Sequence, residues 1–123
     1  MRKYLISLAL LTALVVATPV NAVFYSGNVM MDNCNNTGYG ESVQNESSYY
    51  ACISFLAGIN DTQAILVSWH LASKPIFCIP GGARPEQLRQ VFLAYMKQKP
   101  EEWDLPASGQ AIRAFAGAWP CKQ

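Results

Sequence analysis

The sequence predicts a small all-α domain, a four-helix bundle braced by two disulfide bonds. Two segments in its C-terminal half carry apolar residues at helical spacing, and each is opened by a proline, Pro85 or Pro106. No stretch longer than a few residues alternates between apolar and polar side chains as a strand would. The cysteines are even in number, which is typical of a small domain stabilised by disulfides: Cys34, Cys52, Cys78 and Cys121.

The first 22 residues have the composition of a secretory signal peptide. A basic start, Met1-Arg2-Lys3, precedes an apolar run over 4–17, and Val20-Asn21-Ala22 supplies the small residues of a peptidase site. A membrane anchor is the alternative interpretation, but this run is shorter than the ~20 residues that cross a bilayer core. We therefore expect cleavage after Ala22, which leaves a single exported domain over 23–123.

The charge of this domain argues against two classes of partner. The chain has nine basic and eight acidic residues, and two of the basic ones, Arg2 and Lys3, lie in the expected leader. The remaining domain is nearly neutral and has no basic stripe, which argues against nucleic acid and against an anionic membrane surface. A domain of this size buries a modest share of its surface, so covalent braces would stabilise it.

The N-terminal half of the domain contains two expected helices joined by a polar loop. Ser26 suits the N-cap of a helix of about two turns that ends near Cys34. We expect a loop over 35–48, which is polar and contains glycine. A long helix then begins near Ser47, and its pattern fades before Pro75. Gly58 inside this helix would cost ~1 kcal/mol relative to alanine, and it predicts either a closely packed neighbouring helix or a kink.

The two C-terminal helices are patterned most clearly. The third begins at Pro85 and is stopped by Pro100, and its apolar residues fall on one face: Leu88, Val91, Phe92, Tyr95 and Met96. The fourth begins at Pro106 and carries a seam of small residues: Ala107, Ala111, Ala114 and Ala118. Because small residues let helix axes approach, we expect the fourth helix to lie against the third over much of its length.

Helix geometry favours one of the three possible cysteine pairings. The short connection after Pro100 makes the third and fourth helices antiparallel, which places Cys78, before the third, near Cys121, after the fourth. The same argument for the first two helices places Cys34 opposite Cys52. Each bridge would stabilise the domain by ~3 kcal/mol or slightly more.

The search for a reactive centre finds little. His70 is a conceivable general base, but no nucleophile can be placed beside it from spacing, and the cysteines are expected to be oxidised. The cysteine spacings match no zinc pattern. We therefore expect no catalytic residue, no metal and no cofactor.

Two segments are candidates for partner binding instead. Trp103 stands among carboxylates, including Glu101 and Glu102, and tryptophan is enriched where partners bind. A solvated turn or a packed tryptophan is the alternative there. The second candidate is Trp69 with His70, in a segment without a clear place in the core.

An ordered set of short motifs runs through the expected domain: Gly27-Asn28, Cys34, Cys52, Phe55, Gly58, Asp61, Cys78-Ile79-Pro80-Gly81-Gly82, Gln87-Leu88, Tyr95, Pro100-Glu101, Ala107 and Trp119-Pro120-Cys121. This set resembles the Rap/Tai family of periplasmic immunity proteins, which protect bacteria against type VI-secreted peptidoglycan amidases. The chain departs from the family at Ala83, where threonine or valine is usual, and at Trp119, where phenylalanine is usual.

The resemblance implies a helical homodimer that blocks the amidase's catalytic cleft with a protruding loop, so that inhibition is steric and this chain catalyses nothing. The segments 35–48 and 69–74 are the two candidates for that loop. An alternative function is a small periplasmic acid-stress chaperone, whose client binding would switch on at low pH. A third, a hydrolase, would depend on His70 or Glu102.

Overall fold

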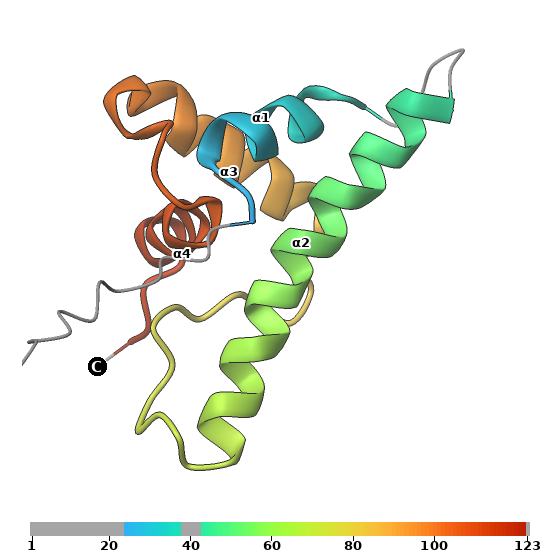
Figure 1. Cartoon of the computed structure of the whole chain (residues 1–123). Helices are drawn as coiled ribbons and strands as arrows, with labels where there is room; N and C mark the ends of the chain where they lie inside the picture. The colour runs from blue at the N-terminus through green and yellow to red at the C-terminus, as the bar shows by residue number, and fades with distance from the viewer. Residues whose placement is uncertain (1–23, 38–42, 123) are drawn as a thin grey trace, which may run out of the picture.

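The computed structural model describes residues 24–37 and 43–122, which contain four α-helices and one short 3-10 turn (Figure 1). In chain order these are α1 (Gly27–Asn35), α2 (Val43–Ser68), α3 (Pro85–Gln98), η1 (Pro100–Glu102) and α4 (Ala107–Ala118). Within these residues there is no strand beyond an isolated bridge between Ser26 and Pro106. The all-α prediction is confirmed, whereas the expected leader lies outside the described residues.

The core lies where α1, α3 and α4 meet the middle of α2. From the predicted stripe of α3, Leu88, Phe92 and Met96 are buried, while Val91 and Tyr95 pack against them at the edge. Phe77, in the loop before α3, packs edge-to-face on Phe115 of α4, with ring centroids 5.4 Å apart. The largest fully buried hydrophobic side chains are Phe77, Phe92, Phe115, Met30, Leu56 and Met96.

α4 buries most of the predicted alanine seam. Ala107, Ala111 and Ala114 are buried, but Ala118 is exposed, so the seam ends earlier than expected. Figure 1 shows α4 almost end-on while α3 runs across the view. The two axes therefore cross, and the expectation that α3 and α4 lie antiparallel along much of their length is wrong.

Both expected disulfides are present. Cys34–Cys52 joins α1 to α2 with Cα atoms 5.0 Å apart, and Cys78–Cys121 joins the loop before α3 to the tail after α4 with Cα atoms 4.9 Å apart. The pairing is confirmed, but the second bridge does not arise from antiparallel helices. Instead the loop itself lies against the end of α4, where the backbone N–H of Cys78 donates to the Trp119 carbonyl over 2.8 Å.

α2 is longer than expected, and little of it is buried. It begins at Val43, so the predicted loop over 35–48 is too long, and only Cys52 and Leu56 of its 26 residues are buried. Figure 1 shows its C-terminal half extending beyond the other helices. By length and composition it is apolar enough to cross a membrane, with 11% of that apolar window buried. Because its bridge to α1 ties it into the folded domain, we interpret it as a domain helix with an uncovered apolar surface.

A close backbone approach occurs at Gly27, where α1 begins. The N–H of Gly27 donates to the Leu105 carbonyl over 2.8 Å, and the N–H of Asn28 donates to the Trp103 carbonyl over 2.9 Å. The Asn28 amide also donates to the Asp104 carboxylate over 3.1 Å. These bonds fix the start of α1 against the connector between α3 and α4.

Gly58 has no comparable role. A Cβ built on Gly58 meets nothing within 4 Å, so the predicted close packing of another helix at this position is wrong for the described residues. α2 continues as a helix through it.

A buried arginine connects three helices. The Arg89 side chain donates to the Glu86 carboxylate over 2.7 to 3.1 Å, and it also donates to the Cys34 carbonyl at the end of α1. The Tyr49 hydroxyl of α2 donates to Glu86 over 3.3 Å. The bonds from Arg89 contribute most to lowering the pKa of Glu86 from 4.5 to about 2, against the opposing effect of burial.

Replacing Gly27 by alanine should destabilise the fold by about 1–3 kcal/mol, the range typical of overpacking. The new Cβ would lie 2.6 Å from the Met96 methyl and 2.9 Å from the Trp103 carbonyl oxygen, and that main-chain oxygen cannot rotate away. Urea denaturation measures the change. Gly58→Ala is the matched control, because relief of the glycine penalty inside a helix should raise stability by up to about 1 kcal/mol. Equal effects at the two positions would contradict the close approach.

Replacing Glu86 by glutamine should lower the free energy of unfolding near neutral pH by about 1–3 kcal/mol, because buried Arg89 loses its carboxylate. The folded pKa of Glu86 lies below its unfolded value, so its contribution is complete above about pH 4.5 and is lost as the pH falls towards 2. Urea unfolding should show the gap between wild type and variant closing over that range. Glu101→Gln, at an exposed carboxylate, should cost under about 0.5 kcal/mol. A gap that stays constant on acidification would refute this assignment.

Candidate functional site

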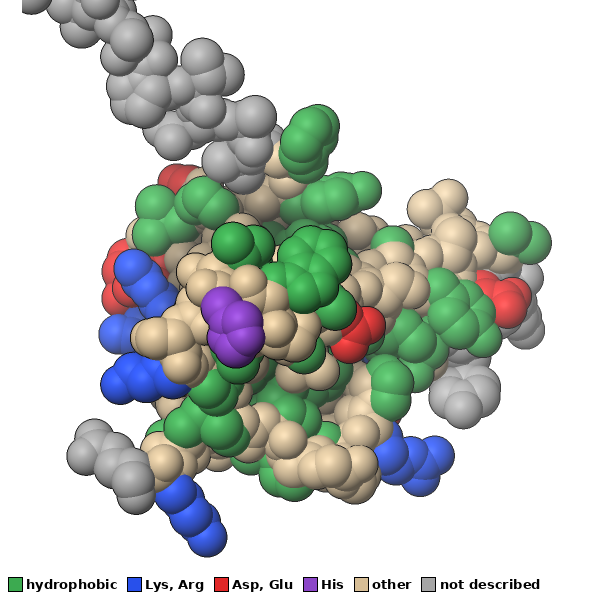
Figure 2. All heavy atoms as spheres, turned by 90° about the horizontal axis from the view of Figure 1, so that it is seen from below, with side chains coloured by type: hydrophobic (Ala, Val, Ile, Leu, Met, Phe, Trp, Pro, Cys, Tyr) green, Lys and Arg blue, Asp and Glu red, His purple; other side chains and the backbone are tan. Residues whose placement is uncertain are grey.

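Exposed hydrophobic side chains gather at the free end of α2. Figure 2 looks onto this end and shows them around the purple histidine. Trp69 is 67% exposed and Leu71 is 70% exposed, while Ile65 and Leu66 on the last turns of α2 are exposed as well. We call these four residues together with His70 the α2 tip. Grouped exposed apolar side chains are typical of interaction surfaces.

His70 ends α2 in a left-handed conformation. Its φ is 59°, the only positive value at a non-glycine residue in the part of the chain that the structure describes. The N–H of His70 donates to the Val67 carbonyl over 3.1 Å, and the N–H of Leu71 donates to the Leu66 carbonyl over 2.9 Å. These are the two bonds of a Schellman motif, whose left-handed residue is usually glycine. His70 therefore has a structural role as the helix stop.

A side-chain clamp returns the chain from the tip to the core. The Gln63 side-chain oxygen accepts from the N–H groups of Ile76 and Phe77 over 2.7 Å and 3.1 Å. The Gln63 amide nitrogen donates to the Phe77 carbonyl over 2.9 Å. Phe77 is itself buried, and the next residue, Cys78, is bridged to Cys121. The segment between the tip and the core is thus held at both ends.

An apolar groove lies beside the tip. It has a volume of about 280 Å³ and lies between α2, the loop over 72–77 and α4. We call it the α2 groove, and its apolar lining consists of Ile59, Leu66, Ala72, Ile76, Phe77 and Ile112. The tip is a projecting apolar surface and the groove is a recessed one, and they share Leu66.

Trp103, the other tryptophan singled out from the sequence, is packed into the fold. It is half-buried against the core, and its indole N–H donates to the Met96 carbonyl over 2.7 Å. Trp103 is therefore a packed tryptophan, which was the alternative to a partner-binding role.

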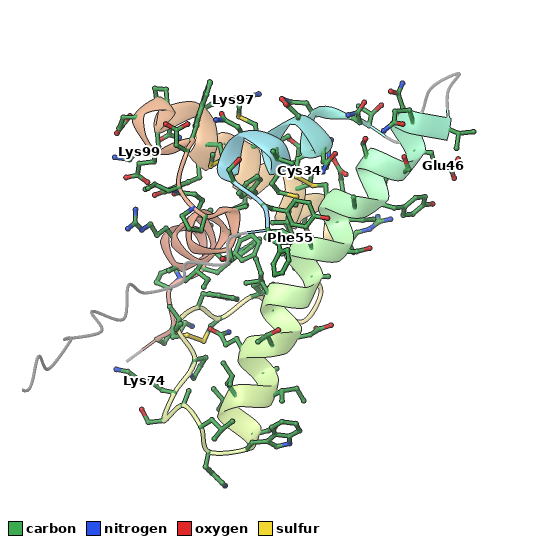
Figure 3. The ribbon with its side chains drawn as sticks, in the orientation of Figure 1. Cys34, Glu46, Phe55, Lys74, Lys97 and Lys99 are labelled. Atoms are coloured by element: carbon green, nitrogen blue, oxygen red, sulfur yellow. A yellow bond between two sulfur atoms is a disulfide. The ribbon has the colours of Figure 1, made fainter. Side chains whose placement is uncertain are left out.

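The neighbouring carboxylates face their own domain or solvent. Glu102 accepts from the Tyr95 hydroxyl over 3.1 Å and from the Arg113 guanidinium over 3.0 Å. Glu101 is exposed, with its nearest cation, Lys99, 3.9 Å away. Figure 3 labels Lys99 at the opposite end of the molecule from the loop that follows α2. The structure thus does not bring this segment together with Trp69 and His70.

The described residues support binding better than chemistry. All four cysteines are in disulfides. No group of three or more His, Cys, Asp or Glu side chains is placed to hold a metal within the described ranges. The His70 imidazole is exposed at the end of a helix, and no residue of the described part is hydrogen-bonded to it. What remains as a candidate site is the α2 tip with the α2 groove.

Sequence reasoning missed two parts of this surface. Leu71 is not among the partner-binding residues predicted beside Trp69, and Ile76, which is 60% exposed, is not predicted as a surface residue. A usable signal existed, because both are apolar residues that fit no helical stripe. The position of Ile76 beside Gln63 depends on the chain reversal at His70, which spacing does not reveal.

Replacing His70 by glycine should raise the free energy of unfolding by about 1 kcal/mol, because glycine adopts positive φ without a Cβ clash. This net value already allows for the greater conformational entropy that glycine gives the unfolded chain. His70→Ala is the control: it keeps the Cβ and removes the imidazole, so its stability should stay within about 0.5 kcal/mol of wild type. Thermal or urea unfolding of both variants tests this. An alanine variant more stable than the glycine variant would contradict the role assigned to this position.

Comparison with known proteins adds the family. A model of the Rap1a immunity proteins matches residues 26–121. No curated protein and no solved structure matches the chain. The family match spans both disulfides, the α2 tip and the α2 groove. It confirms the resemblance seen in the ordered motifs, and the chain belongs to the Rap1a immunity protein family.

Proposed function

We propose that this chain is a periplasmic immunity protein that binds a type VI-secreted peptidoglycan amidase and inhibits it sterically. The observation that carries the proposal is the α2 tip, an exposed apolar surface at the end of a projecting helix in a member of an immunity family. A projecting apolar end is the part of this molecule best shaped to enter the concave active site of another protein.

Inhibition in this proposal requires no reaction on the immunity protein. Trp69 and Leu71 enter the amidase cleft and exclude its substrate. An exposed tryptophan is an effective anchor, because its burial removes a large apolar area from water, and tryptophan is enriched among residues that dominate binding energy. The Gln63 clamp and the Cys78–Cys121 bridge order the segment in advance, which lowers the entropy lost on binding.

Of the two predicted inserting segments, we propose 69–74. In the other, residues 38–42 lie outside the described part of the chain, and 43–48 form the first turns of α2. The segment 69–74 instead presents two highly exposed apolar side chains on a turn closed by hydrogen bonds.

The same proposal places the mature chain in the periplasm as a non-catalytic homodimer. Two disulfides suit an oxidising compartment, and the expected leader would direct export. A second copy of the chain would cover part of the apolar surface that α2 leaves unburied. Size-exclusion chromatography with light scattering measures the assembly directly.

The acid-stress chaperone is a second candidate, because an exposed apolar surface also suits unfolded clients. It requires a group that titrates in mild acid. Glu86, whose carboxylate ties α2 to α3, has a pKa of about 2 and stays ionised there. Suppression of client aggregation at low pH, with no binding to a cell-wall amidase, would favour the chaperone.

Replacing Trp69 by alanine together with Leu71 by serine should abolish protection. A candidate amidase, chosen from the products of neighbouring genes, is produced in the periplasm with wild type or variant, and cell lysis is followed. Loss of two anchors should weaken binding of the purified amidase by at least about thirtyfold, roughly 2 kcal/mol. Val43→Ser removes a side chain that is 84% exposed at the other end of α2, and should protect as wild type does.

Two results would count against the proposal. Full protection by the double variant would exclude the α2 tip as the inhibitory surface. Absence of binding between the wild-type chain and any peptidoglycan amidase would exclude the function itself.

A further inference from the structure

The α2 groove is a preformed recess of the size of a large side chain. Its volume is about 280 Å³, and its exposed lining is almost entirely apolar. The wall that contains Ile76 and Phe77 is fixed by the three hydrogen bonds of Gln63, and the facing wall is a helix. A recess that is already formed does not lose ordering entropy when it is filled.

Positive charge marks one end of this groove. Lys74 lines the groove, and it also lines an adjoining hollow together with Lys122 and Ile76. Neither lining contains an aspartate or a glutamate. Among the ion pairs of the described residues, none involves Lys74 or Lys122. The recess therefore combines an apolar interior with a cationic mouth.

We infer that the α2 groove receives a segment of a partner protein that presents a large apolar side chain next to a carboxylate. The apolar side chain fills the recess between Leu66 and Ile112, and the carboxylate lies at the mouth beside Lys74. Charge complementarity selects this occupant, because a carboxylate at the mouth is attracted by Lys74 whereas a cationic neighbour is repelled by it. The inference rests on the proposed function, in which this partner is the amidase.

A protein segment fits this surface better than a membrane does. Attraction to an anionic bilayer needs several cations on one face, whereas the charges here are spread over the molecule. Figure 3 labels Lys74 beside the loop that follows α2, and Lys97 and Lys99 at the opposite end. Of these three lysines only Lys74 lines the α2 groove, a narrow recess that would take a single side chain.

Two capped hexapeptides test the groove without the amidase. Their sequences are Gly-Ser-Phe-Glu-Gly-Ser and Gly-Ser-Phe-Lys-Gly-Ser, and each is titrated into the ¹⁵N-labelled mature protein while amide chemical shifts are recorded. We expect shifts at Leu66, Ala72 and Ile112, and about threefold tighter binding of the glutamate peptide, the range of one exposed ion pair.

Three variants complete the design. Lys74→Glu should reverse the preference, so that the lysine peptide binds more tightly, while Lys97→Glu at the far end should leave it unchanged. Ser108→Trp places an indole at the groove from the exposed first turn of α4 and should remove the shifts for both peptides. Circular dichroism verifies that each variant is folded, and Lys74→Glu tests the inference even if Ser108→Trp does not fold.

Several outcomes would overturn the inference. These are no shifts at groove residues with wild type, equal affinity for the two peptides, or a preference that Lys74→Glu leaves unaltered. Binding of phosphatidylglycerol vesicles that depends on Lys74, without peptide binding, would assign the surface to lipid instead. Peptide binding without inhibition of any amidase would refute the proposed function alone, and protection without peptide binding would refute the groove alone.

Discussion

Attachment of α2 at its middle is the constraint on which the rest of this structure depends. Cys52, bridged to Cys34, and Leu56, one turn later, are the only buried residues in a helix of 26. A bridge across a separation of 18 residues contributes about 3 kcal/mol in chain-entropy terms. That is a large share of the ~5–15 kcal/mol by which small domains are stable. Arg89 reinforces the same junction through its bonds to Glu86 and to the Cys34 carbonyl.

This attachment separates the buried part of α2 from its exposed part. The first half of α2 meets α1 and α3, while the second half carries the apolar surface outward. Projection alone would leave a frayed end, because exposed helix termini open easily. The Schellman turn at His70 and the Gln63 clamp prevent this by closing the terminus and returning the chain to a buried phenylalanine, Phe77. The exposed residues are therefore held by a local hydrogen-bond framework instead of by the core.

The sequence predicted the parts of this fold that follow from the spacing of apolar residues and from the prolines that begin and end helices. The boundaries of α3 follow from Pro85 and Pro100. The cysteine pairing is correct, but the helix ends expected to meet do not: Cys52 lies inside α2, and Cys78 lies in a loop against the end of α4. It failed where tertiary contacts decide. The crossing of α3 and α4 depends on how alanines and aromatic rings pack together. The open surroundings of Gly58 depend on the positions of the other helices, none of which packs against it. Of the candidate site, Trp69 and His70 were found because they lacked a core role, whereas the groove was not, because its walls come from distant segments.

The cysteines pair in the order in which they occur along the chain, first with second and third with fourth. A polypeptide that enters an oxidising compartment with its N-terminus first can form each disulfide as soon as the second cysteine of the pair arrives there. Each cysteine pairs with the next one along the chain, so no non-native disulfide has to form first and be rearranged. Assembly of this protein is therefore compatible with simple sequential oxidation, without a disulfide isomerase.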